Sequence, residues 1–345
     1  MSNTTVLVEL TRGSLVESVH RGAIAILGAD GSEVLSLGDI ARPVYPRSAF
    51  KALQALPLVE SGAAEAFSLS NAEIALACAS HSGEAAHVAT VRDLLMRLGL
   101  DERALACGAH APSGEQAARD LLLSGARPSR LHNNCSGKHA GMLVLARHLG
   151  VPVEGYEHPD HPVQQRIRET ISQMAGVALT PDGCGIDGCS APNWAMPLRS
   201  LAHAFARFSV QAEMDDTRTA ACCRILSACF EEPGMVAGTG RLCTSIMYRL
   251  KGRAFVKTGA EGVYAAMFPE HGLGVALKID DGAKRAAEFV IRDLCAAVLP
   301  DEADKLADLI SRDIYNWRGE PVGRIRLSED AAAALEKLRT RMSAA

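Results

Sequence analysis

The order of the predicted elements constrains the fold of this chain most strongly. Short strands with alternating apolar residues are predicted in the first part of the chain at residues 6–10, 16–21, 23–27 and in a run ending at 37. Strands are predicted again towards the other end, at 254–257, 262–267, 273–279 and 322–327. The region between them has a helical period. Such an order suits one antiparallel sheet that both ends of the chain build and that helices cover.

The helical period sets the expected division of the chain. Helices are predicted at 48–59, 71–79, 84–98, 114–123, 138–149, 161–175, 198–208, 217–230, 282–298, 301–310 and 330–342. We therefore expect an α/β (α+β) protein with an antiparallel sheet from both chain ends, flanked by helices. Residues 1–60 and 240–345 would form the sheet-containing domain and residues 61–239 a mainly helical domain, with the active site between them.

Composition excludes several classes of function. The chain is 48% hydrophobic and carries a formal charge of −4, so it can bury a large core but lacks the basic excess typical of proteins that bind nucleic acid or anionic membranes. Its start, MSNTTVLVEL, lacks the basic and apolar regions of a signal peptide, and no apolar run reaches the ~18 residues that span a bilayer. We expect a cytoplasmic protein whose ten cysteines are mostly reduced, which leaves metal binding or catalysis open to them.

Lysine is scarce, and one lysine stands in a suggestive place. Of 36 basic residues only eight are lysine, so a lysine in this chain calls for a reason that arginine does not satisfy. Ser48 and Lys51 lie three apart at the start of a predicted helix, which places the amine within reach of the hydroxyl. An amine that burial or a second cation has deprotonated can take the serine proton and activate the nucleophile. The spacing alone is common, and a capping serine beside a solvated lysine is the plain alternative.

A second lysine supports the same chemistry. Lys257-Thr258-Gly259 ends a predicted strand late in the chain, and a Lys-Thr-Gly strand after an early Ser-x-x-Lys helix is the order of the serine β-lactamases and penicillin-binding proteins. The Ser-Asp-Asn triplet of those enzymes is missing. Ser80 stands in a plausible place for its serine, either as a helix cap or as a second hydroxyl hydrogen-bonded to Lys257.

Two loops carry residues with reactive side chains. Residues 131–141 contain two asparagines, Cys135, Lys138 and His139 just before a helix, and residues 182–192 contain two acidic residues and two thiols among glycines. Thiolates from both loops could meet on one soft divalent metal, for which zinc is the usual choice. The spacing is not that of a zinc finger or ribbon. No Gly-x-Gly-x-x-Gly unit follows a strand, so nucleotide binding has little support.

These motifs together resemble the rhizobial-type, or class 3, L-asparaginases, whose fold is similar to that of serine β-lactamases and glutaminases. The resemblance runs through motifs along most of the chain: Glu9-Leu10-Thr11-Arg12-Gly13 with Val16-Glu17-Ser18, Tyr45-Pro46-Arg47-Ser48, Asn133-Asn134-Cys135-Ser136-Gly137-Lys138-His139, Asp187-Gly188-Cys189, and Lys257-Thr258-Gly259. The run from Asn133 to His139 is the most specific of them.

The resemblance implies roles for individual residues. It implies a nucleophile, Ser48, with Lys51 as its partner, and a second pair formed by Ser80 and Lys257. It also implies a zinc ion held by Cys135, Lys138 and Cys189, with water as the remaining ligand, and substrate contacts from Arg47, His139 and Asp187. A lysine ligand must lose its proton to coordinate, so the affinity for zinc would decrease as the pH is lowered. A homodimer is the family's usual form.

The reaction expected from these roles is the hydrolysis of L-asparagine to L-aspartate and ammonia through an acyl-enzyme. Two alternatives remain open at this point. One is another serine amidase of the same fold, such as a glutaminase or a β-lactamase-like or peptidase-like enzyme. The other is a non-catalytic protein that contains zinc and binds amino acids.

Overall fold

The protein is described by a computed structural model that covers residues 5–210 and 214–344. Its main sheet is eight-stranded and antiparallel, with the order β11-β12-β1-β2-β10-β9-β8, and β3 pairs with β2 beside this path. The strands are β1 (Thr5–Arg12), β2 (Leu15–Gly28), β3 (Glu33–Leu37), β8 (Phe255–Gly259), β9 (Val263–Phe268), β10 (Leu273–Ile279), β11 (Asp313–Tyr315) and β12 (Pro321–Leu327). Both chain ends therefore build one sheet, and the predicted α/β class is confirmed.

Two small ribbons lie outside this sheet: β4 (Pro43–Val44) with β7 (Met196–Pro197), and β5 (Cys184–Ile186) with β6 (Pro192–Trp194). The helices are α1 (Lys51–Glu60), α2 (Ala63–Ala66), α3 (Asn71–Ala77), α4 (Ala85–Arg97), α5 (Glu115–Leu123), α6 (Ser136–Leu149), α7 (Pro162–Ala175), α8 (Leu198–Val210), α9 (Asp216–Glu231), α10 (Pro233–Val236), α11 (Leu242–Leu250), α12 (Lys284–Val298) and α13 (Glu329–Ser343). Short 3-10 helices occur at Arg47–Phe50, Glu102–Ala104, Arg130–His132, Pro181–Gly183, Pro269–His271 and Pro300–Leu306.

The centre of the sheet is covered on both faces. All of β9 and nearly all of β10 are buried, and successive side chains of a strand point to opposite faces, so each face must have a cover. Helices α8 and α12 both pack on β9 and β10 and supply it. The approach of α8 is close, because a Cβ on Gly274 would lie 2.0 Å from the Ala202 carbonyl oxygen.

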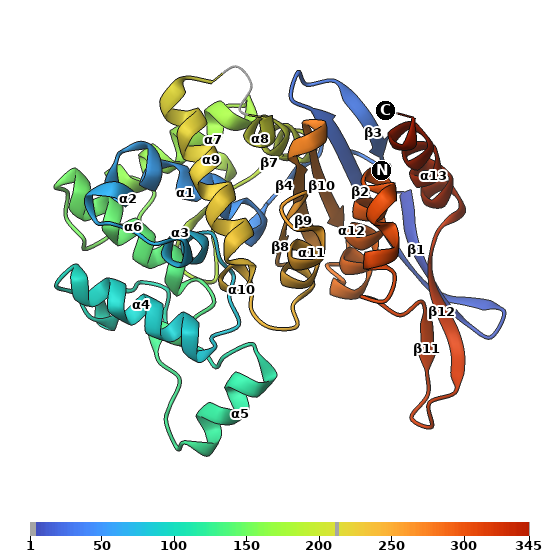
Figure 1. The fold of residues 1–345 in the computed structure, drawn as a ribbon, viewed down its shortest axis with the longest axis horizontal. Coiled ribbons are helices and arrows are strands. Elements are labelled where there is room, and N and C mark those ends of the chain that lie inside the picture. Colours follow the sequence, from blue (N-terminus) through green and yellow to red (C-terminus); the bar gives the residue numbers. More distant parts are fainter. Residues whose placement is uncertain (1–4, 211–213, 345) are drawn as a thin grey trace.

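The remaining helices gather beside the sheet. Figure 1 shows α1, α2, α3, α4, α6, α7 and α9 on one side of the molecule, with α12 and α13 against the sheet on the other. Helix α8 lies within residues 61–239, which were expected to form the helical domain, yet it packs on the sheet. The predicted division into two domains stays a prediction. None of the described helices is both long enough and apolar enough to cross a membrane.

Two local expectations are corrected by the structure. The predicted strands at 16–21 and 23–27 form one strand, β2, which continues through Gly22, where a side chain would collide with the Lys278 carbonyl oxygen. The helix predicted at 301–310 is the shorter 3-10 helix Pro300–Leu306, because Leu306 is its one buried residue and it has no apolar face to pack. Several elements were not predicted: helices α2, α10 and α11 and strands β4, β5, β6, β7 and β11.

Candidate active site

Ser48 lies in the 3-10 turn Arg47–Phe50 that leads into α1. The residue before it, Arg47, has a positive φ of 52°, a strained backbone conformation for a residue with a side chain. The Arg47 N–H donates a hydrogen bond to Asn193 Oδ1 at 3.3 Å, which helps to hold this conformation. Ala49 and Phe50 are buried, whereas Ser48 is half-buried. The turn therefore anchors its apolar side in the core and leaves the serine partly accessible.

The Lys-Thr-Gly strand lies directly against this turn. A Cβ on Gly259 would lie 2.5 Å from the Pro46 carbonyl oxygen and 3.1 Å from the Ala49 nitrogen, so only glycine permits this approach. Lys257 is two residues before Gly259 on β8 and therefore shares its face of the strand. The fold thus brings the predicted late strand to the predicted early helix.

Lys257 is completely buried. Its amine donates a hydrogen bond to the Thr258 carbonyl oxygen at 3.0 Å. Burial, and then the positive charge of Lys51, lower the pKa of Lys257 to about 7. A substantial fraction of this amine is therefore unprotonated at neutral pH.

Lys51 joins α1 to two loops of the site. Its buried Nζ donates to the Ala79 carbonyl oxygen at 2.6 Å and to the Cys135 sulfur at 3.1 Å. Between the two described residues Lys51 and Ser48 there is no hydrogen bond. The structure thus brings the predicted partners into one turn of helix, with the amine directed to Ala79 and Cys135.

Ser80 immediately follows the carbonyl that Lys51 binds. Its N–H donates to the Val236 carbonyl oxygen at 3.0 Å, and its Oγ accepts a hydrogen bond from Asn134 Nδ2 at 3.4 Å. The predicted hydrogen bond from Ser80 to Lys257 is not formed between these described residues. Hydrogen bonds of catalytic groups are often long or absent without substrate, so this geometry does not decide the role of Ser80.

The start of α6 carries the second cluster. Lys138 is buried and its Nζ donates to the Cys189 sulfur at 3.0 Å. A hydrogen bond from the Cys135 thiol, and then the charge of Lys138, hold the pKa of Cys189 below its usual range; the same hydrogen bond raises the pKa of Cys135. Burial disfavours the Lys138 ammonium, but its interaction with Cys189, and then with Cys135, outweighs burial and raises the pKa of Lys138. The three predicted zinc ligands therefore meet.

Their chemistry fits zinc, with one qualification from the structure. Two sulfurs and one amine nitrogen form the soft donor set that zinc prefers. Among the described residues, no group of three or more His, Cys, Asp and Glu side chains is placed to hold a metal. A zinc site therefore requires Lys138 as its third protein ligand, with zinc in place of the ammonium proton.

The predicted substrate contacts come from three elements. Asp187 and Cys189 lie in the tip between β5 and β6, where the Asp187 carboxylate also accepts a hydrogen bond from the Gly188 N–H at 2.7 Å. Arg47 donates from Nε and Nη2 to Asp187 Oδ1 at 3.1 and 2.8 Å. The two charges that were expected to bind opposite ends of an amino acid thus bind each other here. They present a cation and an anion side by side.

His139 is fully buried, and burial lowers its pKa, so its ring is uncharged at neutral pH. Its Nδ1 lies 2.6 Å from the Tyr156 hydroxyl. Tyr156 and Asn193 were missed by the sequence analysis, because no motif surrounds either residue. Only the fold places them beside Arg47 and His139.

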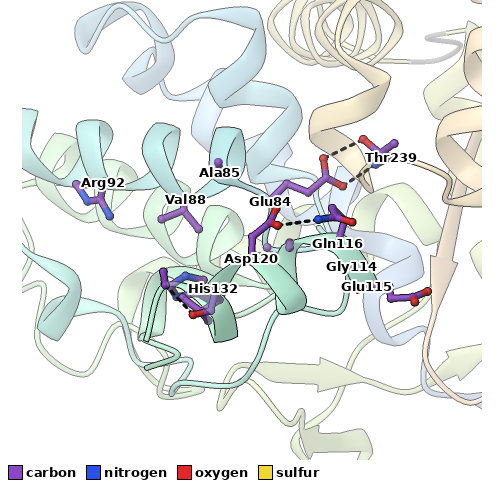
Figure 2. A pocket seen from close by; sticks show the side chains of 14 residues that line it. Glu84, Ala85, Val88, Arg92, Gly114, Glu115, Gln116, Asp120, His132 and Thr239 are labelled. Atoms are coloured by element: carbon purple, nitrogen blue, oxygen red, sulfur yellow. Dashed lines mark hydrogen bonds between the residues drawn. The ribbon is translucent and has the colours of Figure 1, made fainter. Parts of the chain in front are cut away.

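A surface hollow of about 670 Å³ lies outside this site, between the start of α4 and α5. Figure 2 shows Glu84 pointing to Thr239 across one end of it. Its lining residues in the described part of the chain include none of the predicted site residues. A hydrogen bond connects this hollow to the segment that carries Ser80, because the Gly114 N–H donates to the Ser82 carbonyl oxygen at 2.9 Å.

A family model places the chain in a known family. The family model of L-asparaginase II matches residues 8–327. Among solved structures, Mglu in its native form is 15% identical with a TM-score of 0.45, over 81% of this chain and 64% of that one. A beta-lactamase from Mycobacterium bovis is 16% identical with a TM-score of 0.42, over 82% and 95% of the two chains. This chain thus spans slightly less than two thirds of Mglu. A search of curated proteins found no match.

Proposed function

The chain belongs to the L-asparaginase II family, and we propose that it carries out amide hydrolysis on L-asparagine with Ser48 as the nucleophile. The observation that carries the proposal is the meeting of two buried lysines, Lys51 and Lys257, around the accessible serine turn. An amine close to a hydroxyl can act as its base only when it is unprotonated, and burial beside Lys51 lowers the pKa of Lys257 and favours that form there.

Substrate binding would use the ion pair of Arg47 and Asp187. The α-carboxylate of asparagine can accept hydrogen bonds from the Arg47 guanidinium, and its α-ammonium can donate to Asp187. Both residues keep an exposed part of their side chains, 28% and 14%, so an incoming zwitterion can reach them. Asp187 in the β5–β6 tip and Arg47 beside Ser48 would then fix the substrate relative to the nucleophile.

The chemical steps follow from these positions. Ser48 Oγ attacks the side-chain amide carbon while Lys51 takes the hydroxyl proton, and backbone N–H groups of the turn bind the oxyanion. The proton passes to the departing amide nitrogen, the C–N bond breaks, and ammonia leaves an aspartyl ester on Ser48. Water then attacks the ester, releases aspartate and restores the serine. Ser80 and Lys257 form the second pair that handles protons at the leaving group.

We also propose a zinc ion held by Cys135, Lys138 and Cys189, next to this machinery. When bound there, zinc would supply a positive charge that positions a polar group of the substrate. Cys189 follows Asp187 by two residues, so the metal site and the substrate contact share one tip.

Removing one zinc ligand should remove the metal. Cys135→Ala and Cys189→Ala are each expected to lose bound zinc, because two remaining protein ligands hold zinc weakly. Mass spectrometry of metal in the purified protein measures the content. Cys184→Ala is the matched control, since Cys184 lies on the same hairpin, and it should keep its zinc. Wild-type protein without zinc, after purification in zinc-containing buffer, would contradict the proposal.

The pH dependence of kcat/KM should follow the protonation of Lys257. Because its pKa is about 7, kcat/KM is expected to rise as pH increases through 7, where the amine loses its proton. Lys257→Met should reduce kcat/KM on the order of a hundredfold and remove that inflection. Lys305→Met, a partly exposed lysine away from the site, serves as control.

The same substitution should affect stability in the opposite sense. The folded pKa of Lys257 lies below its unfolded value, so burying the ammonium costs stability fully below pH 7 and progressively less as pH rises towards 10. Lys257→Met is therefore expected to raise Tm, and to raise it more at pH 6 than at pH 9. If Lys257→Met changed Tm by the same amount at both pH values, the pKa of the buried amine would not differ between the folded and unfolded protein.

The proposed activity has a direct test. Ammonia release should be measured on L-asparagine, L-glutamine and a chromogenic β-lactam, with asparagine expected as the preferred substrate. Preference for glutamine or hydrolysis of the β-lactam would favour another serine amidase. Asparagine binding by calorimetry without turnover would favour a non-catalytic binding protein. We further propose a homodimer, which sedimentation velocity would test.

A further inference from the structure

The turn that carries Ser48 receives its cap from a distant part of the chain. Arg47 is the first residue of this turn, and the N–H groups at the start of a helix have no partner within the helix. Pro46 stands at the capping position, and its side chain has no oxygen that could accept a hydrogen bond. The acceptor is Oδ1 of Asn193, 146 positions further along the chain and 3.3 Å from the Arg47 nitrogen. A buried residue of strand β6 therefore caps the turn.

This cap meets a strained backbone. Arg47 has a φ of 52°, in the left-handed region that residues with a side chain seldom adopt. Such a conformation persists only where the surrounding contacts hold it. Strand β8 leaves room for it, because a Cβ on Gly259 would lie 3.3 Å from the Arg47 Cβ. Asn193 and Gly259 together set the direction in which the arginine side chain leaves the turn.

The hairpin that carries Asn193 also holds the far end of the arginine. Asn193 pairs with Gly185 across the hairpin, and Asp187 lies in the tip that joins β5 to β6. Nε and Nη2 of Arg47 both donate to Asp187 Oδ1, at 3.1 and 2.8 Å, so the carboxylate occupies one edge of the guanidinium. Arg47 Nη1 makes no hydrogen bond to a described residue. The edge formed by Nη1 and Nη2 can therefore bind a second carboxylate through two parallel hydrogen bonds.

The segment before the turn lies along the same hairpin. Val44 pairs with Met196 in the ribbon of β4 and β7, just after the end of β6. The Tyr45 ring covers Gly185, where a Cβ would lie 3.0 Å from Cε1 of the ring. These contacts keep the arginine turn against the hairpin on both sides of the Asn193 cap.

We infer that Asn193 is a positioning residue for substrate binding: its side-chain oxygen fixes the backbone of Arg47, so that the free edge of the guanidinium faces the α-carboxylate of the substrate. This role rests on the proposed function, since it requires a substrate whose α-carboxylate Arg47 binds. Without the Asn193 oxygen, Arg47 is free to adopt a negative φ, which moves its Cβ and redirects the guanidinium. The substrate then loses a contact that is remote from the bond that breaks.

Asn193→Leu is the primary test, because leucine has nearly the shape of asparagine but no acceptor. KM for L-asparagine should rise on the order of tenfold while kcat changes less than about threefold, since the lost contact is made equally before and during the reaction. β-Alaninamide, which is asparagine without its α-carboxylate, isolates the role of Arg47. Its inhibition constant against asparagine hydrolysis should stay within about threefold of the wild-type value. Asn193→Ala should give the same pattern and replaces Asn193→Leu if the leucine variant does not fold.

Ser328→Ala is the matched control. Ser328 is also buried, and its side chain caps helix α13 by accepting a hydrogen bond from the Ala331 N–H at 3.2 Å. Loss of this cap should lower Tm, because the Ala331 N–H loses its acceptor. It should change neither KM for asparagine nor the inhibition constant of β-alaninamide. Loss of a helix cap as such would then not explain a raised KM in Asn193→Leu.

A crystal structure of Asn193→Leu gives a measurement apart from activity. Arg47 is expected to leave the left-handed region and to change its hydrogen bonds with Asp187. Three results would overturn the role of Asn193. They are an unchanged KM in folded Asn193→Leu, an equal rise in KM and in the inhibition constant of β-alaninamide, and an Arg47 that keeps its φ and its bonds to Asp187 in the variant.

Failure of the proposed function would look different. If the wild type released no ammonia from asparagine, the proposed function would fail. Crystal structures of the wild type and of Asn193→Leu would still decide whether Asn193 holds Arg47. The two failures are therefore distinguishable.

Discussion

Ser48→Ala is expected to abolish ammonia release from L-asparagine, with kcat reduced by roughly 10³- to 10⁶-fold. Without the hydroxyl no acyl-enzyme forms, and only binding and the oxyanion contacts remain to accelerate the reaction. Stopped assays with a sensitive ammonia detector measure the residual rate. Mass spectrometry of acid-quenched wild type should show the aspartyl adduct on the peptide that contains Ser48.

Folding should not account for this loss. Ser48 is half-buried and its hydroxyl forms no hydrogen bond with another described residue, so Tm should change little. Ser61→Ala, at the other end of α1 and equally half-buried, is the matched control and should remain active. Ser80→Ala should retain some acylation. An inactive Ser80→Ala together with an active Ser48→Ala would indicate that Ser80, and not Ser48, is the nucleophile.

Lys51→Met is expected to reduce kcat by at least roughly a thousandfold, because the group that receives the serine proton is removed. Lys51→Arg should be nearly as inactive, since a guanidinium keeps the positive charge but does not give up its proton. The comparison separates loss of the base from loss of charge. Single-turnover kinetics would place the defect in acylation.

Stability must be followed in the same variants. In Lys51→Met the buried Ala79 carbonyl loses its donor, at a cost of about 1–3 kcal/mol, whereas removal of a buried amine offsets part of that cost. Lys278→Arg is the matched control, because Lys278 also donates to backbone carbonyls, those of Glu261 and Ile279, outside the site. Near-normal turnover in folded Lys51→Met would refute its role as base and would turn attention to Lys257.

Local pattern was enough for most elements of the fold. The period of α1, α7 and α9 and the strands β9 and β10 follow from apolar spacing that is strong over short windows. The errors have tertiary causes. Gly22 signals a break in the sequence, but the Lys278 carbonyl that it faces belongs to β10, a strand far along the chain. Helix α11 ends at Lys251, a left-handed residue other than glycine that directly precedes Gly252.

The candidate site divides in the same way. The residue types were evident from the sequence: Ser48 with Lys51 at helical spacing, the Lys257-Thr258-Gly259 strand, and the loops that contain Cys135 and Cys189. Their pairing was not. Arg47 was expected to bind a substrate carboxylate, and the fold pairs it with Asp187 first. The amine of Lys51 was expected to contact the Ser48 hydroxyl, but it donates hydrogen bonds to the Ala79 carbonyl oxygen and the Cys135 sulfur.

Residue types and spacing indicate which chemistry is available: lysines at three positions of the predicted site, thiols in two loops, and a serine at a helix start. Which of these groups share a low-dielectric environment follows from the tertiary packing alone. The lowered pKa of Lys257 arises from burial and from Lys51, more than 200 positions away in the chain. The Tyr156 hydroxyl that lies 2.6 Å from His139 Nδ1 likewise comes from another segment of the chain. Burial and hydrogen-bond partners are properties of distant contacts, and residue spacing does not encode them.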